Sequence, residues 1–219
     1  IDGDFLESWR YFDMATVRIA SEEVIITRTG FSNELGWEFY LRPENNAEAV
    51  GNRIWKAGQA HGMILTGTPV FRARRIEAGL MSQAEFDETT TPYDAGLGHF
   101  VKIDDRDFIG KAALETADKR NRTFGMRVRS GIAERGRTMS IDGKIVGQVC
   151  SSSWSPFQEC GVALVRVDDP ATGPGTEVRV LGNDQKIYEA VLCALPMYDA
   201  AGDIVRGRVT DLPSGPDPW

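Results

Sequence analysis

Residues 28–41 read RTGFSNELGWEFYL, and this stretch decides how we expect the first part of the chain to fold. It opens with Thr, Gly, Ser and Asn within residues 29–33, a cluster that favours a turn. Apolar and polar side chains then alternate over residues 36–41, which is typical of a half-buried strand. The stretch therefore predicts a turn that leads into a strand with two different faces.

Successive side chains of a strand point to opposite faces of the sheet. On one face we expect core residues, namely Trp37, Phe39 and Leu41. On the other face Glu38 and Tyr40 lie together. A carboxylate beside a phenol can form a wall of a ligand site, or it can simply face water. From the stretch alone, the second interpretation is favoured.

The composition of the whole chain excludes several classes of protein. A net charge of -7 over 219 residues argues against a nucleic-acid partner, which needs clustered Lys and Arg. No apolar run is long enough for a membrane span, and the acidic start does not resemble a signal peptide. Three cysteines without CxxC spacing, and two distant histidines, predict neither a disulfide framework nor a metal site. We therefore expect a cytoplasmic protein that binds neither nucleic acid nor membrane.

The first part of the chain mixes strands with helices. We predict strands over residues 14–20 and 24–27 with a turn at 21–23, and helices over 47–60, 68–78 and 108–119. The expected N-caps are Asn45 or Asn46 for the first helix, Thr68 for the second and Asp107 for the third.

The second part is rich in short strands. They are predicted over residues 123–128, 138–141, 144–151, 161–167, 177–181 and 187–195, with a tight hairpin at Asp142-Gly143. Regular spacing of this kind predicts a small β-barrel. The expected fold class is therefore α+β, with a ferredoxin-like α/β domain over residues 1–120 and a C-terminal β-barrel domain over 121–219.

Five motifs in order resemble the folate-dependent aminomethyltransferase family, which includes the glycine cleavage T-protein, demethylases and the C-terminal halves of dimethylglycine and sarcosine dehydrogenases. The first is RTGFSNELGWEFY at residues 28–40. The others are RIEAGL at 75–80, TPYDAGL at 91–97, DFIGK at 107–111 and GQVCSSSWSP at 147–156. Two of them depart from the family pattern, with Asp94 in place of a glutamate and Ser152 in place of a glycine.

The resemblance implies tetrahydrofolate as cofactor and a small-molecule methyl or aminomethyl donor as partner. It places Glu38 at the position that holds the pterin edge, and Tyr40 at that of an aromatic in contact with folate. Phe71 and Arg72 are the expected contacts from the following helix. The nearby Arg74 and Arg75 are also candidates for the acidic folate tail, but pairing with acids on the protein is favoured for at least two of these three arginines.

The resemblance also limits what this chain can do alone. Family members carry a comparable length of chain before the Arg-Thr-Gly stretch, including the catalytic aspartate, so we expect a missing N-terminal portion to be needed and assign no catalytic residue here. Phe71 replaces an arginine of the T-protein, which favours a demethylase-like or dehydrogenase-associated relative. A non-catalytic folate-binding module is the alternative. It is disfavoured because residues 107–111 lack the cysteine of the iron–sulfur assembly relatives.

Overall fold

The computed structural model describes residues 8–210, which divide into two compact units. Residues 8–71 and 201–210 form the first unit, and residues 72–200 form the second. Each unit is described by itself. Across residues 8–210, no helix combines the length and the apolar character needed to cross a lipid bilayer.

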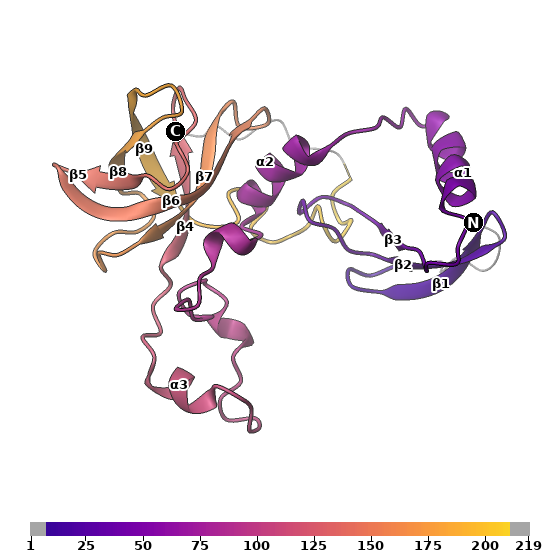
Figure 1. Cartoon of the computed structure of the whole chain (residues 1–219), viewed down its shortest axis with the longest axis horizontal. Coiled ribbons are helices and arrows are strands. Elements are labelled where there is room, and N and C mark those ends of the chain that lie inside the picture. Colours follow the sequence, from indigo (N-terminus) through magenta and orange to yellow (C-terminus); the bar gives the residue numbers. More distant parts are fainter. Residues whose placement is uncertain (1–7, 211–219) are drawn as a thin grey trace. The chain divides into compact units, whose positions relative to one another are not determined.

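The first unit contains a three-stranded antiparallel sheet in the order β1-β2-β3 (Figure 1). The strands are β1 (Met14–Ile19), β2 (Glu22–Thr27) and β3 (Glu38–Tyr40). Ala20 and Ser21 join β1 to β2 with φ angles of 51° and 67°. Positive φ at both positions is what a type I′ hairpin loop requires. The turn predicted at residues 21–23 is therefore wrong by one to two residues.

One helix packs against the strand residues that form the core of this unit. In α1 (Ala47–Gln59), the Asn46 side chain accepts a hydrogen bond from the backbone N–H of Ala49 at 3.0 Å, so Asn46 is the cap of the two asparagines that the sequence offered. The helix buries Val50 against the sheet (Figure 1). The buried sheet residues of this core are Val17, Ile19, Val24 and Ile26.

The third strand is shorter than predicted, and only part of its apolar face is covered. Trp37 packs against the core, but Phe39 and Leu41 are 39% and 41% exposed. The buried core residues come from β1, β2 and α1, and none of them comes from β3. Alternation assigned these side chains to a face correctly, but it does not tell whether another element covers that face.

Helix α2 (Thr68–Ala78) has the predicted bounds, and most of its residues belong to the second unit. The helix ends before Gly79, whose φ angle is 73°. Thr68 lies inside this helix, so it is not the predicted cap. Two short 3₁₀ turns follow, η1 (Gln83–Glu85) and η2 (Gly98–Phe100). The predicted third helix is too long: α3 covers only Lys111–Thr116. Gly110, at φ 91°, is the residue that precedes it, so the chain before Lys111 is not helical and Asp107 caps nothing.

The strands of the second unit close into an antiparallel barrel in the order β4-β7-β6-β5-β8-β9 (Figure 1). They are β4 (Thr123–Val128), β5 (Thr138–Ile141), β6 (Lys144–Ser155), β7 (Cys160–Val167), β8 (Glu177–Leu181) and β9 (Ile187–Cys193). Asp142 and Gly143 both have positive φ and join β5 to β6, as predicted. The barrel is thus confirmed. The ferredoxin-like description and the domain boundary at residue 120 stay predictions.

Candidate functional site

Arg28 holds together the stretch that we call the signature loop, residues 28–38. Its side chain is buried and donates two hydrogen bonds of 2.9 Å, from Nη1 to the carbonyl of Gly36 and from Nη2 to the carbonyl of Val205. The guanidinium also lies 5.4 Å from the ring centroid of Trp37, a cation–π contact. Burial lowers the pKa of Arg28. The arginine therefore ties both ends of the loop to the segment that follows the barrel.

The same loop holds the Glu38 carboxylate. Thr29 Oγ1 donates a hydrogen bond to Glu38 Oε2, and the Thr27 hydroxyl is bonded to the Thr29 hydroxyl. An ionised carboxylate only accepts, so Thr29 uses its single proton on Glu38 and Thr27 must donate to Thr29. Within residues 8–210, no group donates to the other oxygen, Oε1. Thr29 therefore binds Oε2 of Glu38, and Oε1 remains available to a ligand.

Tyr40 lies on the same face of β3 as Glu38, two residues further along. The register places Thr27 opposite Glu38 and Ile25 opposite Tyr40. Tyr40 is 49% exposed. The face that carries these residues is opposite the one that α1 covers, so a carboxylate and a phenol stand together on the open side of the sheet.

The RIEAGL motif is used for packing in the second unit. Arg75 Nη1 donates to Glu85 Oε2 and to the carbonyl of Leu80, both at 3.2 Å, and Nη2 donates to Ser151 Oγ at 2.8 Å. Glu85 is buried, and it also closes a capping box with Ser82. These bonds fasten α2 to strand β6 of the barrel.

Arg74, the residue before the motif, also pairs with an acid of the protein. Arg74 Nη1 donates to Glu77 Oε2 at 2.7 Å, and the fully buried Glu77 accepts a second bond from Ser155 Oγ. The Arg74 guanidinium also lies over the ring of Phe157 at 4.8 Å. Arg74 and Arg75 therefore pair with acids of the protein, as predicted for two of the three arginines.

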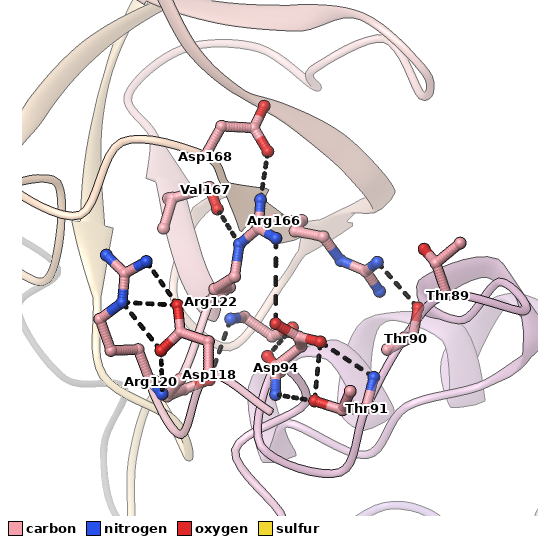
Figure 2. Close-up of polar contacts among 12 residues, drawn as sticks. Thr89, Thr90, Thr91, Asp94, Asp118, Arg120, Arg122, Arg166, Val167 and Asp168 are labelled. Atoms are coloured by element: carbon pink, nitrogen blue, oxygen red, sulfur yellow. Dashed lines mark hydrogen bonds and ion pairs between the residues drawn. The ribbon is translucent and has the colours of Figure 1, made fainter. Parts of the chain in front are cut away.

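The TPYDAGL motif forms a turn that packs on the barrel. The Thr91 backbone N–H and hydroxyl donate to Asp94 Oδ2 at 2.9 and 2.8 Å (Figure 2). The Asp94 carbonyl accepts from the Thr123 hydroxyl at 2.9 Å, and Arg166 of β7 reaches Thr90 at 2.8 Å. Asp94, where the family pattern has a glutamate, thus acts as the capping residue of a turn.

Phe71 and Arg72 differ from the two arginines that follow them on α2. Phe71 is 47% exposed, and Arg72 is exposed as well. Within residues 8–210, Arg72 makes no ion pair and no hydrogen bond. Of the three clustered arginines, only this one keeps its charge available to a ligand.

Two family models match the chain. The GCVT N-terminal domain matches residues 3–105, and the glycine cleavage T-protein C-terminal barrel domain matches residues 119–199. The chain belongs to the glycine cleavage T-protein family. The second match covers all six barrel strands, so the resemblance noted in the motifs extends over both parts of the chain.

Several known proteins are similar to this chain over most of its length. An aminomethyltransferase of Streptomyces coelicolor is 34% identical over 88% of this chain, and a trimethylamine-oxide aldolase of Ruegeria pomeroyi is 33% identical over 88%. The crystal structure of the glycine cleavage system aminomethyltransferase T from Bartonella henselae matches 80% of the chain with a TM-score of 0.70 and 25% identity.

This T-protein family chain spans about half the length of the aminomethyltransferases that it matches. The match covers 54% of the Streptomyces coelicolor protein, 50% of the Bartonella henselae chain and 26% of the aldolase.

Sequence reasoning missed two residues that lie around Glu38, Thr27 and Thr29. Both face Glu38, and a signal for them was present: threonines at i and i+2 share one side of an extended chain, and Thr27 is the cross-strand partner of Glu38. The missing information was how far the signature loop folds back, which brings Thr29 within reach of the carboxylate.

The cysteines of this T-protein family chain are free thiols without an activating environment. Burial raises the pKa of Cys160 and of Cys193 to about 11, and it also raises the pKa of Cys150. Thiolates are the reactive form, so none of the three is suited to act as a nucleophile near neutral pH.

Proposed function

We propose that this chain carries the folate side of a tetrahydrofolate-dependent one-carbon transferase, which accepts a methyl or aminomethyl group from a small-molecule donor in a demethylase-like reaction. The carboxylate of Glu38 is the observation that supports the proposal. One of its oxygens is held by Thr29, and the other is open on the uncovered face of the sheet.

The open carboxylate suits a pterin ring. A pterin presents an N–H and an exocyclic amino group side by side, and a carboxylate accepts such a pair through charge-assisted hydrogen bonds. Glu38 has about four lone-pair positions, of which Thr29 occupies one. Tyr40 offers a ring on the same face, half-exposed and two residues away. In this proposal Glu38 holds the pterin edge and Tyr40 contacts the ring.

The role of these residues is to bind and orient. Bound tetrahydrofolate supplies the nucleophilic N5 nitrogen that takes the one-carbon group. Glu38 fixes the rotation of the pterin in its plane, and such positioning of two reactants can contribute up to about 10 kcal/mol to the lowering of a barrier. We expect the donor-facing groups to lie outside this chain. Phe71 and Arg72 as further folate contacts stay predictions.

The test is tetrahydrofolate affinity in the protein at its full encoded length, for the wild type and Glu38→Gln. The substitution replaces one accepting oxygen by a donor, so a donor would face a donor in the complex. We expect binding to weaken by about 1–3 kcal/mol, because a polar group in the site loses its partner. The thermal unfolding midpoint should change little.

Glu44→Gln is the matched control, since it removes the same charge from an exposed residue of the same unit whose side chain has no hydrogen-bond or ion-pair partner within residues 8–210. Equal affinities for wild type, Glu38→Gln and Glu44→Gln at equal stability would refute the proposal. Folate binding that depends on Glu38 but without transfer from any methyl or aminomethyl donor would instead favour the non-catalytic folate-binding module.

A further inference from the structure

The Glu38 carboxylate is held by a row of two hydroxyls, and each hydrogen bond in the row is donated toward the carboxylate. Thr27 on β2 is the cross-strand partner of Glu38 on β3. Thr29 stands two residues beyond Thr27 and bridges the two, because its hydroxyl is bonded to both side chains. The proton order is fixed by the acceptor-only carboxylate: Thr27 donates to Thr29, and Thr29 donates to Glu38.

The signature loop does not need this row to keep its shape. Arg28 already joins the carbonyls of Gly36 and Val205 with two bonds of 2.9 Å. Gly30 and Gly36 also pass closely, since a Cβ added at Gly36 would lie 3.9 Å from the Gly30 Cα and 3.3 Å from the Thr29 carbonyl oxygen. The backbone is thus held by Arg28 and by the two glycines. The hydroxyl row instead fixes the orientation of the Glu38 side chain.

We propose that Thr29, supported by Thr27, is a positioning residue that pre-orients the Glu38 carboxylate for its ligand. This inference rests on the function proposed above. A free glutamate side chain samples many rotamers, and binding must then order it, at a cost typical of one immobilised side chain. The bond from Thr29 orders Glu38 before the ligand arrives and leaves Oε1 open to accept.

The hydroxyl, and not the volume, of residue 29 is the property that matters. Thr29→Val keeps the shape but removes the donor, and we expect it to weaken tetrahydrofolate binding about fivefold to tenfold. Thr29→Ser keeps the donor, so it should stay within about twofold of the wild type. Thr138→Val is the matched control, because Thr138 is exposed on β5 of the second unit and makes no bond to Glu38.

A double-mutant cycle separates positioning from a structural role. If Thr29 acts through Glu38, then Thr29→Val in a Glu38→Ala background should change affinity by less than about twofold. Thermal unfolding of each variant is measured beside affinity. If Thr29→Val does not fold, Thr27→Val takes its place: it leaves Thr29 without its own donor, and we expect a smaller loss of the same sign.

The outcomes are distinct. Loss of affinity in Thr29→Val, recovery in Thr29→Ser and no further loss in the Glu38→Ala background support the proposal. Unchanged affinity in Thr29→Val while Glu38→Gln is weakened overturns the positioning role and leaves the folate proposal standing. An additive loss in the double variant overturns it as well. No effect of Glu38→Gln itself overturns both.

Discussion

Two motifs of this chain contain an arginine and a glutamate, and the structure uses them in opposite ways. In the RIEAGL helix, Arg75 is enclosed by Glu85, Ser151 and the Leu80 carbonyl, and the fully buried Glu77 is bound by Arg74 and Ser155. In the signature loop, Arg28 is enclosed in the same manner, but Glu38 keeps one oxygen open. A motif with charged residues indicates a ligand site only where a charged group keeps an atom that no other group of the protein binds.

The largest effect on stability is expected in the RIEAGL helix, where the charged side chains are paired within the protein. Arg75→Ala removes one partner of a pair whose side chains are 11% and 0% exposed, and it leaves the buried Glu85 carboxylate without its cationic partner, with only the hydrogen bonds from Ser82. Breaking such a pair typically costs about 3–5 kcal/mol of unfolding free energy. Chemical denaturation checks this. Arg72→Ala is the control, since an exposed and unpaired arginine should contribute less than about 0.5 kcal/mol. Equal losses in the two variants would contradict the contrast.

On the face of the sheet that carries Glu38 and Tyr40, a substitution should lower ligand affinity and leave stability unchanged. Tyr40→Leu removes an aromatic ring from the exposed face of β3, and we expect tetrahydrofolate affinity to drop by about 0.5–1.5 kcal/mol, as for other aromatic contacts. Phe39→Leu makes the same change on the opposite face of the strand and should leave affinity intact. A result in which Phe39→Leu matters more than Tyr40→Leu would place the ligand on the other face.

The smallest effect concerns the pH dependence of the barrel unit. Hydrogen bonds from Thr89 and Thr90, and the charge of Arg166, lower the pKa of Asp87 to about 2. A carboxyl whose pKa is depressed on folding stabilises the fold above its ordinary value, near 3.8, and this contribution is lost as pH falls toward 2. Unfolding midpoints at pH 4.5 and 2.5 should therefore differ less in Asp87→Asn than in the wild type.

Asp104→Asn is the control for that titration, because this exposed carboxyl has no hydrogen-bond partner within the described residues 8–210. Its midpoints should shift with pH as those of the wild type do. If Asp87→Asn also keeps the full wild-type acid sensitivity, the hydrogen bonds that Asp87 accepts from Thr89 and Thr90 contribute nothing to the acid stability of the barrel unit.

Local patterns in the sequence predicted most of the elements. The alternation over residues 123–193 predicted all six barrel strands, and Asp142-Gly143 predicted the β5–β6 turn, because pleat and turn chemistry act between residues that are close in sequence. The same locality explains the errors. The third helix was extended back through Gly110, and Phe39 was assigned to a core that α1 does not bring to it.

By itself, the sequence determined which residues share a face, and so it put Glu38 beside Tyr40. Only the tertiary structure decided which charged side chains have all their partners within the protein. Ser151 reaches Arg75 from 76 residues away, and the Val205 carbonyl reaches Arg28 from 177 residues away. No periodicity encodes such partners, because they depend on how distant segments meet. The openness of Glu38 and Arg72, and the threonine hydroxyls bonded next to Glu38, therefore became visible only in the folded chain.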